Sequence, residues 1–107
     1  REGNYLEATA TNMFAYSMAK AVRKGYVDKK FLDVARTAYQ GVLDELISVN
    51  EGGYVTLHLC CSVAGLGGNP YRDGSFEYYI SEKIRSNDPK GVGPFILAGL
   101  EFEKMKP

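Results

Sequence analysis

The segment from Leu6 to Lys24 carries apolar or small side chains every three or four residues, which predicts an α-helix that ends at Gly25. Its first half has almost no charge on any side, because Ala8, Ala15 and Ala19 lie opposite the apolar stripe. Such a helix is usually packed all round, so we expect an inner helix surrounded by others. The apolar stripe consists of Leu6, Ala10, Met13, Phe14, Ser17, Met18, Ala21 and Val22.

A second helix is expected from about Lys29 to Glu45, with Asp28 as its N-cap and a charged outer side. Because the connection from Gly25 to Asp28 is short, the two helices should form an antiparallel hairpin of an inner and an outer helix. The packed stripe of the second helix consists of Phe31, Ala35, Ala38, Tyr39, Val42 and Leu46.

Residues Tyr54 to Cys61 alternate as a short strand after a turn signal at Asn50 to Gly53, and Leu46 to Val49 could pair with them as a β-hairpin. On such a strand Cys60 and Cys61 point to opposite faces, so we expect two reduced, partly buried thiols. The sequence has one histidine and no CxxC spacing, so no metal site is expected.

The stretch from Ala64 to Ala98 holds the features that point most directly to function. A loop from Ser62 to Pro70 and a helical turn at Ser75 to Ile80 precede a long helix expected from Asp88 to Lys104. Asp88 can cap this helix, and Pro89 suits its first position. Three glycines inside it, Gly91, Gly93 and Gly99, each cost about 1 kcal/mol relative to alanine, so close packing or a ligand must compensate. Its packed side is expected to contain Val92, Phe95, Ile96, Gly99, and Phe102 or Glu103.

Length and charge narrow the classes of protein. A chain of 107 residues forms at most one domain, and we treat residues 1–107 as a single domain. Its 13 basic and 13 acidic side chains balance, and no block of like charge suggests a nucleic-acid or anionic-membrane surface. The apolar runs are too short for a transmembrane helix.

A candidate site follows if the first and last helices are parallel neighbours, because their N-termini then open at one end. Unpaired N–H groups and the positive dipole end would suit an anionic substrate such as a uronate, and tyrosines could supply flat faces for a sugar. The candidate substrate-binding residues are Asn4, Tyr5, Glu7, Arg72, Asp73, Tyr78, Asp88 and Lys90.

Each candidate also has a structural interpretation, which stays open at this point. Glu7 and Asp88 could serve only as helix caps, and Lys90 could be a solvated first-turn lysine. Arg72 could form an ion pair with the adjacent Asp73. Of Tyr78 and Tyr79, we expect one in the core and one at the rim of the site.

Catalytic groups are harder to place. His58 has no nucleophile or acid partner fixed by the sequence, so an exposed or hydrogen-bonded strand residue is expected. A glycosidase normally uses two carboxylates, but the spacing of Asp73 and Asp88 fixes no separation between them. We assign no catalytic residue.

The runs AGLGGNPYRDGSFEYYISEKIRSNDPKGVGPF and NYLEATATNMFAYSMAKAVRKGY resemble the C-terminal third of the unsaturated glucuronyl and rhamnogalacturonyl hydrolases, glycoside hydrolase families 88 and 105. This resemblance implies a mainly α fold: a partial (α/α)6 barrel, made of the C-terminal helices of a six-hairpin toroid, with a short β-hairpin. The chain would then be the C-terminal portion of a larger barrel enzyme.

The resemblance also implies a reaction. Family members act on unsaturated uronyl oligosaccharides from pectin and related polysaccharides: an aspartate protonates the C4=C5 double bond, water adds at C5, and the resulting hemiketal opens. No cofactor is implied, and the compartment would be the bacterial cytoplasm or periplasm. The catalytic aspartate belongs to an earlier inner helix, so this chain would supply cleft wall and be inactive alone.

Two further expectations follow. Exposed flanks of a partial barrel should lead to self-association or to binding of the rest of the barrel. Two alternatives to the hydrolase fragment are a non-catalytic helical module that binds an acidic oligosaccharide or a protein, and an ordinary structural domain whose likeness extends only to the fold.

Overall fold

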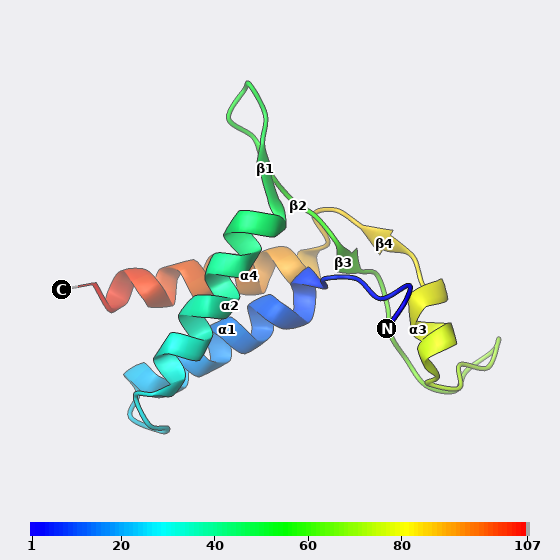
Figure 1. The fold of residues 1–107 in the computed structure, drawn as a ribbon, viewed down its shortest axis with the longest axis horizontal. Coiled ribbons are helices and arrows are strands. Elements are labelled where there is room, and N and C mark those ends of the chain that lie inside the picture. The colour runs from blue at the N-terminus through cyan, green and yellow to red at the C-terminus, as the bar shows by residue number, and fades with distance from the viewer. Residues whose placement is uncertain (107) are drawn as a thin grey trace.

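The computed structural model describes residues 1–106, and about half of these residues are helical (Figure 1). Three long helices lie together, while a short helix and two small antiparallel strand pairs connect them. No helix in this range is long and apolar enough to cross a membrane. In chain order the elements are α1 Ala8–Arg23, α2 Phe31–Glu45, β1 Ile47–Val49, β2 Val55–Leu57, β3 Cys60–Cys61, α3 Phe76–Ser81, β4 Ile84–Arg85 and α4 Pro89–Lys104.

The predicted arrangement of the long helices is confirmed. Helices α1 and α2 form an antiparallel hairpin with Gly25 at a φ of 74° in the turn, and α4 packs against α1 (Figure 1). Both α1 and α4 begin near β3 and run toward the same side, so their N-termini share one end of the molecule (Figure 1). Helix α2 begins two residues later than predicted, because Asp28 accepts the Lys30 N–H in a turn that precedes the helix.

The face that α1 buries differs from the predicted apolar stripe. The buried residues are small or polar, whereas Met13 and Phe14 of the predicted stripe are exposed. Small side chains let α2 and α4 approach α1 closely, and the large side chains lie where residues 1–106 provide no neighbour. The expected burial of α1 on all sides is therefore not reached within this chain. Its buried residues are Ala8, Thr9, Asn12, Ala15 and Ala19.

The helix glycines divide into two groups. A Cβ atom on Gly91 would lie 2.9 Å from Cys60 Sγ, and one on Gly99 would lie 2.8 Å from Tyr39 Oη, so close packing explains both. A Cβ atom on Gly93 would meet nothing within 4 Å. Ile96, predicted to be packed, is exposed beside Gly93, because α4 turns this side away from α1.

The strand prediction is correct in part. Strands β1 and β2 form the expected hairpin, with Ile47 opposite Leu57. The single strand expected from Tyr54 to Cys61 is wrong, however, because Leu59 adopts a φ of 56° and ends it. Residues after this kink form β3, which pairs with β4 instead. As expected, both cysteines are free and both are buried.

The C-terminal halves of α1 and α4 are joined by a bidentate ion pair. Arg23 donates from Nε and Nη2 to the two carboxylate oxygens of Glu101, whose side chain is 3% exposed. The Arg23 guanidinium lowers the pKa of Glu101 below its usual value, so the carboxylate is charged near neutral pH. Glu101 replaces Glu103 as the acidic residue on the packed side of α4.

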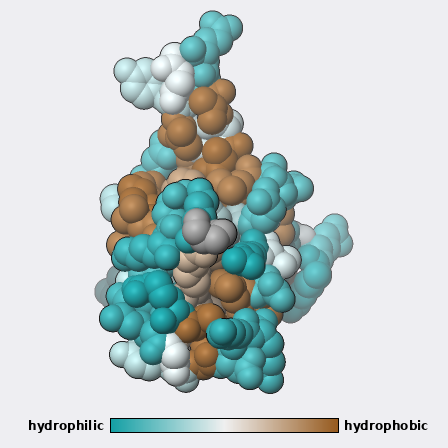
Figure 2. All heavy atoms as spheres, turned by 90° about the vertical axis from the view of Figure 1, so that its left-hand side faces the viewer, coloured by the Kyte–Doolittle hydropathy of each residue, from teal (hydrophilic) through white to brown (hydrophobic). Residues whose placement is uncertain are grey.

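The core is small for a chain of this length. The largest fully buried side chains within residues 1–106 are only Val42, Asn12, Asp88 and Cys60. The radius of gyration is 15.5 Å, against about 13 Å for a compact domain of this length. Apolar side chains reach the surface in several places below the β1–β2 hairpin (Figure 2). The chain thus has the shape of an open piece of a larger helical body.

Candidate active-site rim

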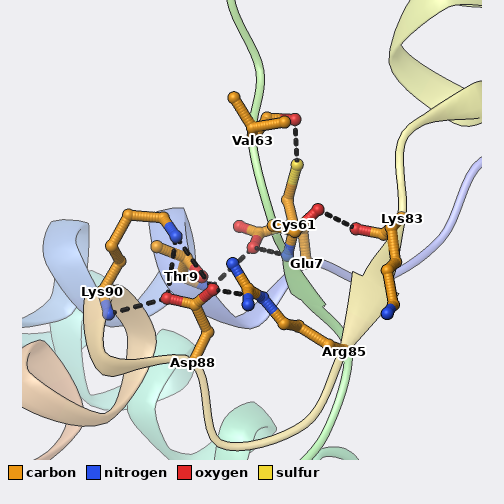
Figure 3. Close-up of polar contacts among 9 residues, drawn as sticks. Glu7, Thr9, Cys61, Val63, Lys83, Arg85, Asp88 and Lys90 are labelled. Atoms are coloured by element: carbon orange, nitrogen blue, oxygen red, sulfur yellow. Dashed lines mark hydrogen bonds and ion pairs between the residues drawn. The ribbon is translucent and has the colours of Figure 1, made fainter.

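Glu7 joins the start of α1 to strand β3 (Figure 3). Its carboxylate accepts the N–H groups of Thr9 and Ala10 at 2.9 and 2.7 Å and thereby caps the helix. The same carboxylate accepts the Cys61 N–H at 2.8 Å. The remaining first-turn donor, the Ala8 N–H, bonds to the Leu59 carbonyl oxygen.

Asp88 stands at the start of α4 and is 1% exposed (Figure 3). It accepts the Lys90 N–H at 2.9 Å and contacts Lys90 Nζ at 2.8 Å through both oxygens, while Arg85 Nε lies 2.7 Å away. The Lys90 ammonium and N–H, with help from Arg85, hold the pKa of Asp88 below its usual value. One carboxylate and two half-exposed cations give this cluster a net charge of plus one.

These contacts change the sequence-based view of the helix ends. The N–H groups that the sequence suggests for an anionic substrate are already bonded to Glu7, Leu59 and Asp88. The half-exposed cations at this end are Lys90 and Arg85, both of which contact Asp88. The role of Glu7 and Asp88 as caps is confirmed.

The tyrosines have packing and supporting contacts. Tyr5 stacks on Tyr79 with a centroid distance of 5.5 Å and an interplanar angle of 5°. Burial raises the pKa of Tyr5. Tyr78 Oη accepts the Gly65 N–H at 3.1 Å and so supports the glycine-rich loop. Tyr78 and Tyr79 are both half-buried, so the expected division into core and rim is not seen.

The predicted ion pair between Arg72 and Asp73 is wrong. Arg72 folds back over the loop, where its Nε donates to the Gly67 carbonyl oxygen at 2.9 Å. A side chain on Gly65 would clash with this guanidinium, which explains the glycine there. Asp73 instead accepts the Ser75 N–H at 2.9 Å just before α3, and this bond lowers its pKa.

The structure distributes the predicted site residues over more than one hollow. Glu7 and Lys90 line a shallow hollow of about 240 Å³ together with Cys61 and Tyr79. Arg72 and Tyr78 line a second one, of about 500 Å³, between the loop and α3. A larger groove of about 1050 Å³ runs between α2 and α4 and contains none of the predicted site residues. Asn4 is exposed. Tyr5 stacks on Tyr79, and Asp88 contacts Arg85, so both residues support neighbouring side chains.

His58 is hydrogen-bonded to two serines. His58 Nε2 lies 2.6 Å from Ser48 Oγ, and Nδ1 lies 3.3 Å from Ser86 Oγ, so the expected hydrogen-bonded residue is confirmed. In residues 1–106 no group of three or more potential metal ligands is found.

Two contributors to the rim were missed from the sequence. Arg85 precedes Asp88 by three residues, and this spacing of opposite charges could have pointed to the pair. The Cys61 N–H bond to Glu7 spans 54 positions of the chain and leaves no local signal.

Comparison with known proteins places this chain in a family. The family model described as Glycosyl Hydrolase Family 88 matches residues 1–106. A glycoside hydrolase from family 105 of C. acetobutylicum superimposes with a TM-score of 0.93 and 50% sequence identity, over 98% of this chain and 29% of that chain. A possible member of the same family from Salmonella enterica gives a TM-score of 0.74 at 29% identity, over 97% of this chain and 24% of that chain.

Among curated proteins, a 24.9 kDa protein in the picA locus of Rhizobium radiobacter is 40% identical over 105 residues, covering 92% of this chain and 45% of its own length. A protein of Agrobacterium fabrum matches to the same extent. The chain thus spans about half of these relatives and less than a third of the solved structures. The predicted partial (α/α)6 barrel is confirmed by the toroidal solved relatives.

Proposed function

Since this chain belongs to glycosyl hydrolase family 88, we propose that it forms the C-terminal part of the substrate-cleft wall of an enzyme that hydrolyses unsaturated uronyl oligosaccharides. In this proposal an aspartate outside the chain protonates the C4=C5 double bond of the uronate. Water then adds at C5, and the hemiketal opens to release the next sugar. Residues 1–107 contribute substrate contacts and no proton donor.

The surroundings of the acidic residues support the proposal that this chain contributes no proton donor. A general acid must hold its proton near neutral pH. The pKa values of Asp73 and Asp88 are instead lowered by hydrogen bonds and, for Asp88, by two cations. Glu7 already accepts three backbone N–H groups, so its carboxylate is engaged in capping α1 and joining it to β3. These environments support a general acid that lies in another segment.

The observation that carries the substrate contact is the position of Lys90. Its side chain is half-exposed, and it lines the hollow beside Tyr79. A lysine ammonium has three N–H donors, and the two oxygens of Asp88 occupy two of them. The third can bond to the carboxylate of a uronate, while Tyr79 presents part of its ring to the sugar. Asp88 acts as a positioning residue for this ammonium.

A chimera tests this proposal. We would replace the matching segment of the C. acetobutylicum hydrolase with residues 1–106 and follow the loss of ultraviolet absorbance of unsaturated glucuronyl and galacturonyl disaccharides. Lys90→Met should raise KM at least about tenfold, as expected for a lost charge-assisted hydrogen bond to a carboxylate. Lys24→Met, an exposed lysine at the other end of α1, is the matched control and should leave KM unchanged.

Two results would contradict the proposal. If the chimera consumes neither disaccharide while the parent hydrolase consumes them, the chain cannot supply the cleft wall. An unchanged KM for Lys90→Met would remove Lys90 from the substrate contacts.

A further inference from the structure

Two apolar edges remain uncovered on the long helices. On α1 and the residue before its cap, Leu6, Met13 and Phe14 are 59, 42 and 64% exposed. On α4, Ile96, Leu97 and Leu100 are 55, 43 and 51% exposed. By helix periodicity each group lies opposite the residues through which α1 and α4 pack together. The three-helix unit therefore has one apolar edge on each side.

The amount of exposed surface matches a missing partner. The accessible surface is 7130 Å², whereas a folded monomer of 11.8 kDa exposes about 5900 Å². The difference of about 1200 Å² exceeds the roughly 800 Å² that each partner buries in a stable protein complex. The chain as a whole therefore exposes more surface than a closed domain of its size, by an amount that a partner could cover.

Gly93 adds an independent indication. It lies in the interior of α4, where glycine costs about 1 kcal/mol relative to alanine. A Cβ atom there would meet nothing within 4 Å, so packing inside this chain does not explain it. Gly93 lies on the same side of α4 as Ile96, Leu97 and Leu100, at helical spacing. A glycine in an apolar helix face allows another backbone to approach closely.

We propose that both edges are docking surfaces for the N-terminal helices of a family 88 or 105 barrel, and that residues 1–107 can join those helices as a separate chain. This concerns assembly and goes beyond the proposed function. The argument for this occupant is the solved relative from C. acetobutylicum, in which a unit of nearly the same structure makes up only 29% of the chain. The rest of a toroid meets such a unit at both ends.

A second copy fits the two edges less well. In a two-fold symmetric dimer each copy uses the same patch, so one of the two edges would stay exposed. Head-to-tail association could cover both, but it would need further copies to close a ring. The rest of a toroid is a single partner that covers both edges.

Co-expression tests the proposal without any measurement of activity. The N-terminal part of the C. acetobutylicum hydrolase, lacking the segment that matches this chain, would carry an affinity tag and be produced together with residues 1–107. We expect a one-to-one complex on affinity purification and analytical ultracentrifugation. Phe14→Glu and Leu97→Glu should each weaken it at least about tenfold, because either buries a charge in an apolar contact.

Two variants separate docking from folding. Val34→Glu changes an exposed apolar residue of α2, outside both edges, and should leave the complex intact. Gly93→Leu should preserve or increase the helix content of the isolated chain by circular dichroism, since its Cβ meets nothing, yet it should weaken the complex. Absence of a complex, equal loss with Val34→Glu, or a trimer of the isolated chain would each overturn the proposal. Inactivity of a complex that forms would refute the proposed function alone.

Discussion

Replacing Glu101 by glutamine should destabilise the chain strongly. The change leaves the Arg23 guanidinium, 28% exposed, without a charged partner between α1 and α4. Breaking a buried ion pair from one side costs about 3–5 kcal/mol, and the partial hydration of Arg23 places the cost near 3 kcal/mol. Lys104 Nζ, 3.5 Å from Glu101 and half-exposed, contributes less than about 1 kcal/mol.

This loss is large relative to the stability available. Domains have about 0.05–0.15 kcal/mol of stability per residue, and the small core places this chain near about 5 kcal/mol. Glu101→Gln should therefore remove more than half of the free energy of unfolding. Urea denaturation followed by circular dichroism measures this as a lower midpoint with an unchanged slope.

Two control variants show whether the loss comes from the buried ion pair. Glu103→Gln removes an exposed ion pair with Lys106 and should change the free energy of unfolding by less than about 0.5 kcal/mol. The double variant Arg23→Met and Glu101→Leu should recover part of the loss, since no unpaired charge remains. A loss below about 1 kcal/mol for Glu101→Gln would refute the claim that this pair holds α1 to α4.

The ion pair also sets a pH dependence. The folded-state pKa of Glu101 lies below its unfolded value, which is about 4.3. Its stabilisation is therefore fully present above that value and is lost as the pH falls through the lower folded pKa. Wild-type stability should drop in this acidic range by more than that of Glu101→Gln, as measured by urea denaturation at a series of pH values.

Three other substitutions give separate checks by urea denaturation. Gly91→Ala should lower the free energy of unfolding by about 1–3 kcal/mol, because its Cβ would lie 2.9 Å from Cys60 Sγ. Gly93→Ala should raise the free energy of unfolding of the isolated chain by about 1 kcal/mol. Equal effects would contradict the packing described. Glu7→Gln should cost about 1 kcal/mol through a weakened cap, and no change would exclude its role in joining α1 to β3. Asp88→Asn should reduce the free energy of unfolding at neutral pH, and the variant should lose less stability in acid than the wild type does. The reason is that the pKa of Asp88 is lowered in the folded state. A pH profile identical to that of the wild type would contradict this.

The sequence predicted well those features whose causes are local. The Asp88-Pro89 pair identifies the start of α4, and Gly25 the end of α1, because caps depend on neighbouring residues. The β1–β2 hairpin follows from a turn signal between two short apolar segments. The three-helix arrangement then follows from short connections.

Features that depend on distant neighbours could not be predicted in the same way. Helix α1 is apolar or small on both sides, so periodicity alone cannot decide that Ala15 is buried and Phe14 exposed. The adjacency of Arg72 and Asp73 suggested an ion pair, but a loop of glycines let Arg72 fold back on Gly67. The strand ended early because Leu59 adopts a left-handed conformation, which a leucine does not signal.

The candidate site shows the same division. Glu7 and Asp88 could be placed at the two helix starts, but the sequence did not reveal that their carboxylates already occupy the nearby N–H groups. Lys90 could be predicted only as a candidate substrate-binding residue or a solvated lysine of the first turn. Its fixed position comes from the two oxygens of Asp88, which a structure alone reveals.

The most direct test compares the chain alone with the chimeric hydrolase on the same unsaturated uronyl disaccharides. The central claim predicts that the chimera removes the ultraviolet absorbance of the conjugated uronate, while residues 1–107 alone leave it unchanged. Loss of absorbance with the isolated chain would contradict the claim, because the proton donor would then lie within it, and Asp73 and Asp88 would be the first residues to replace.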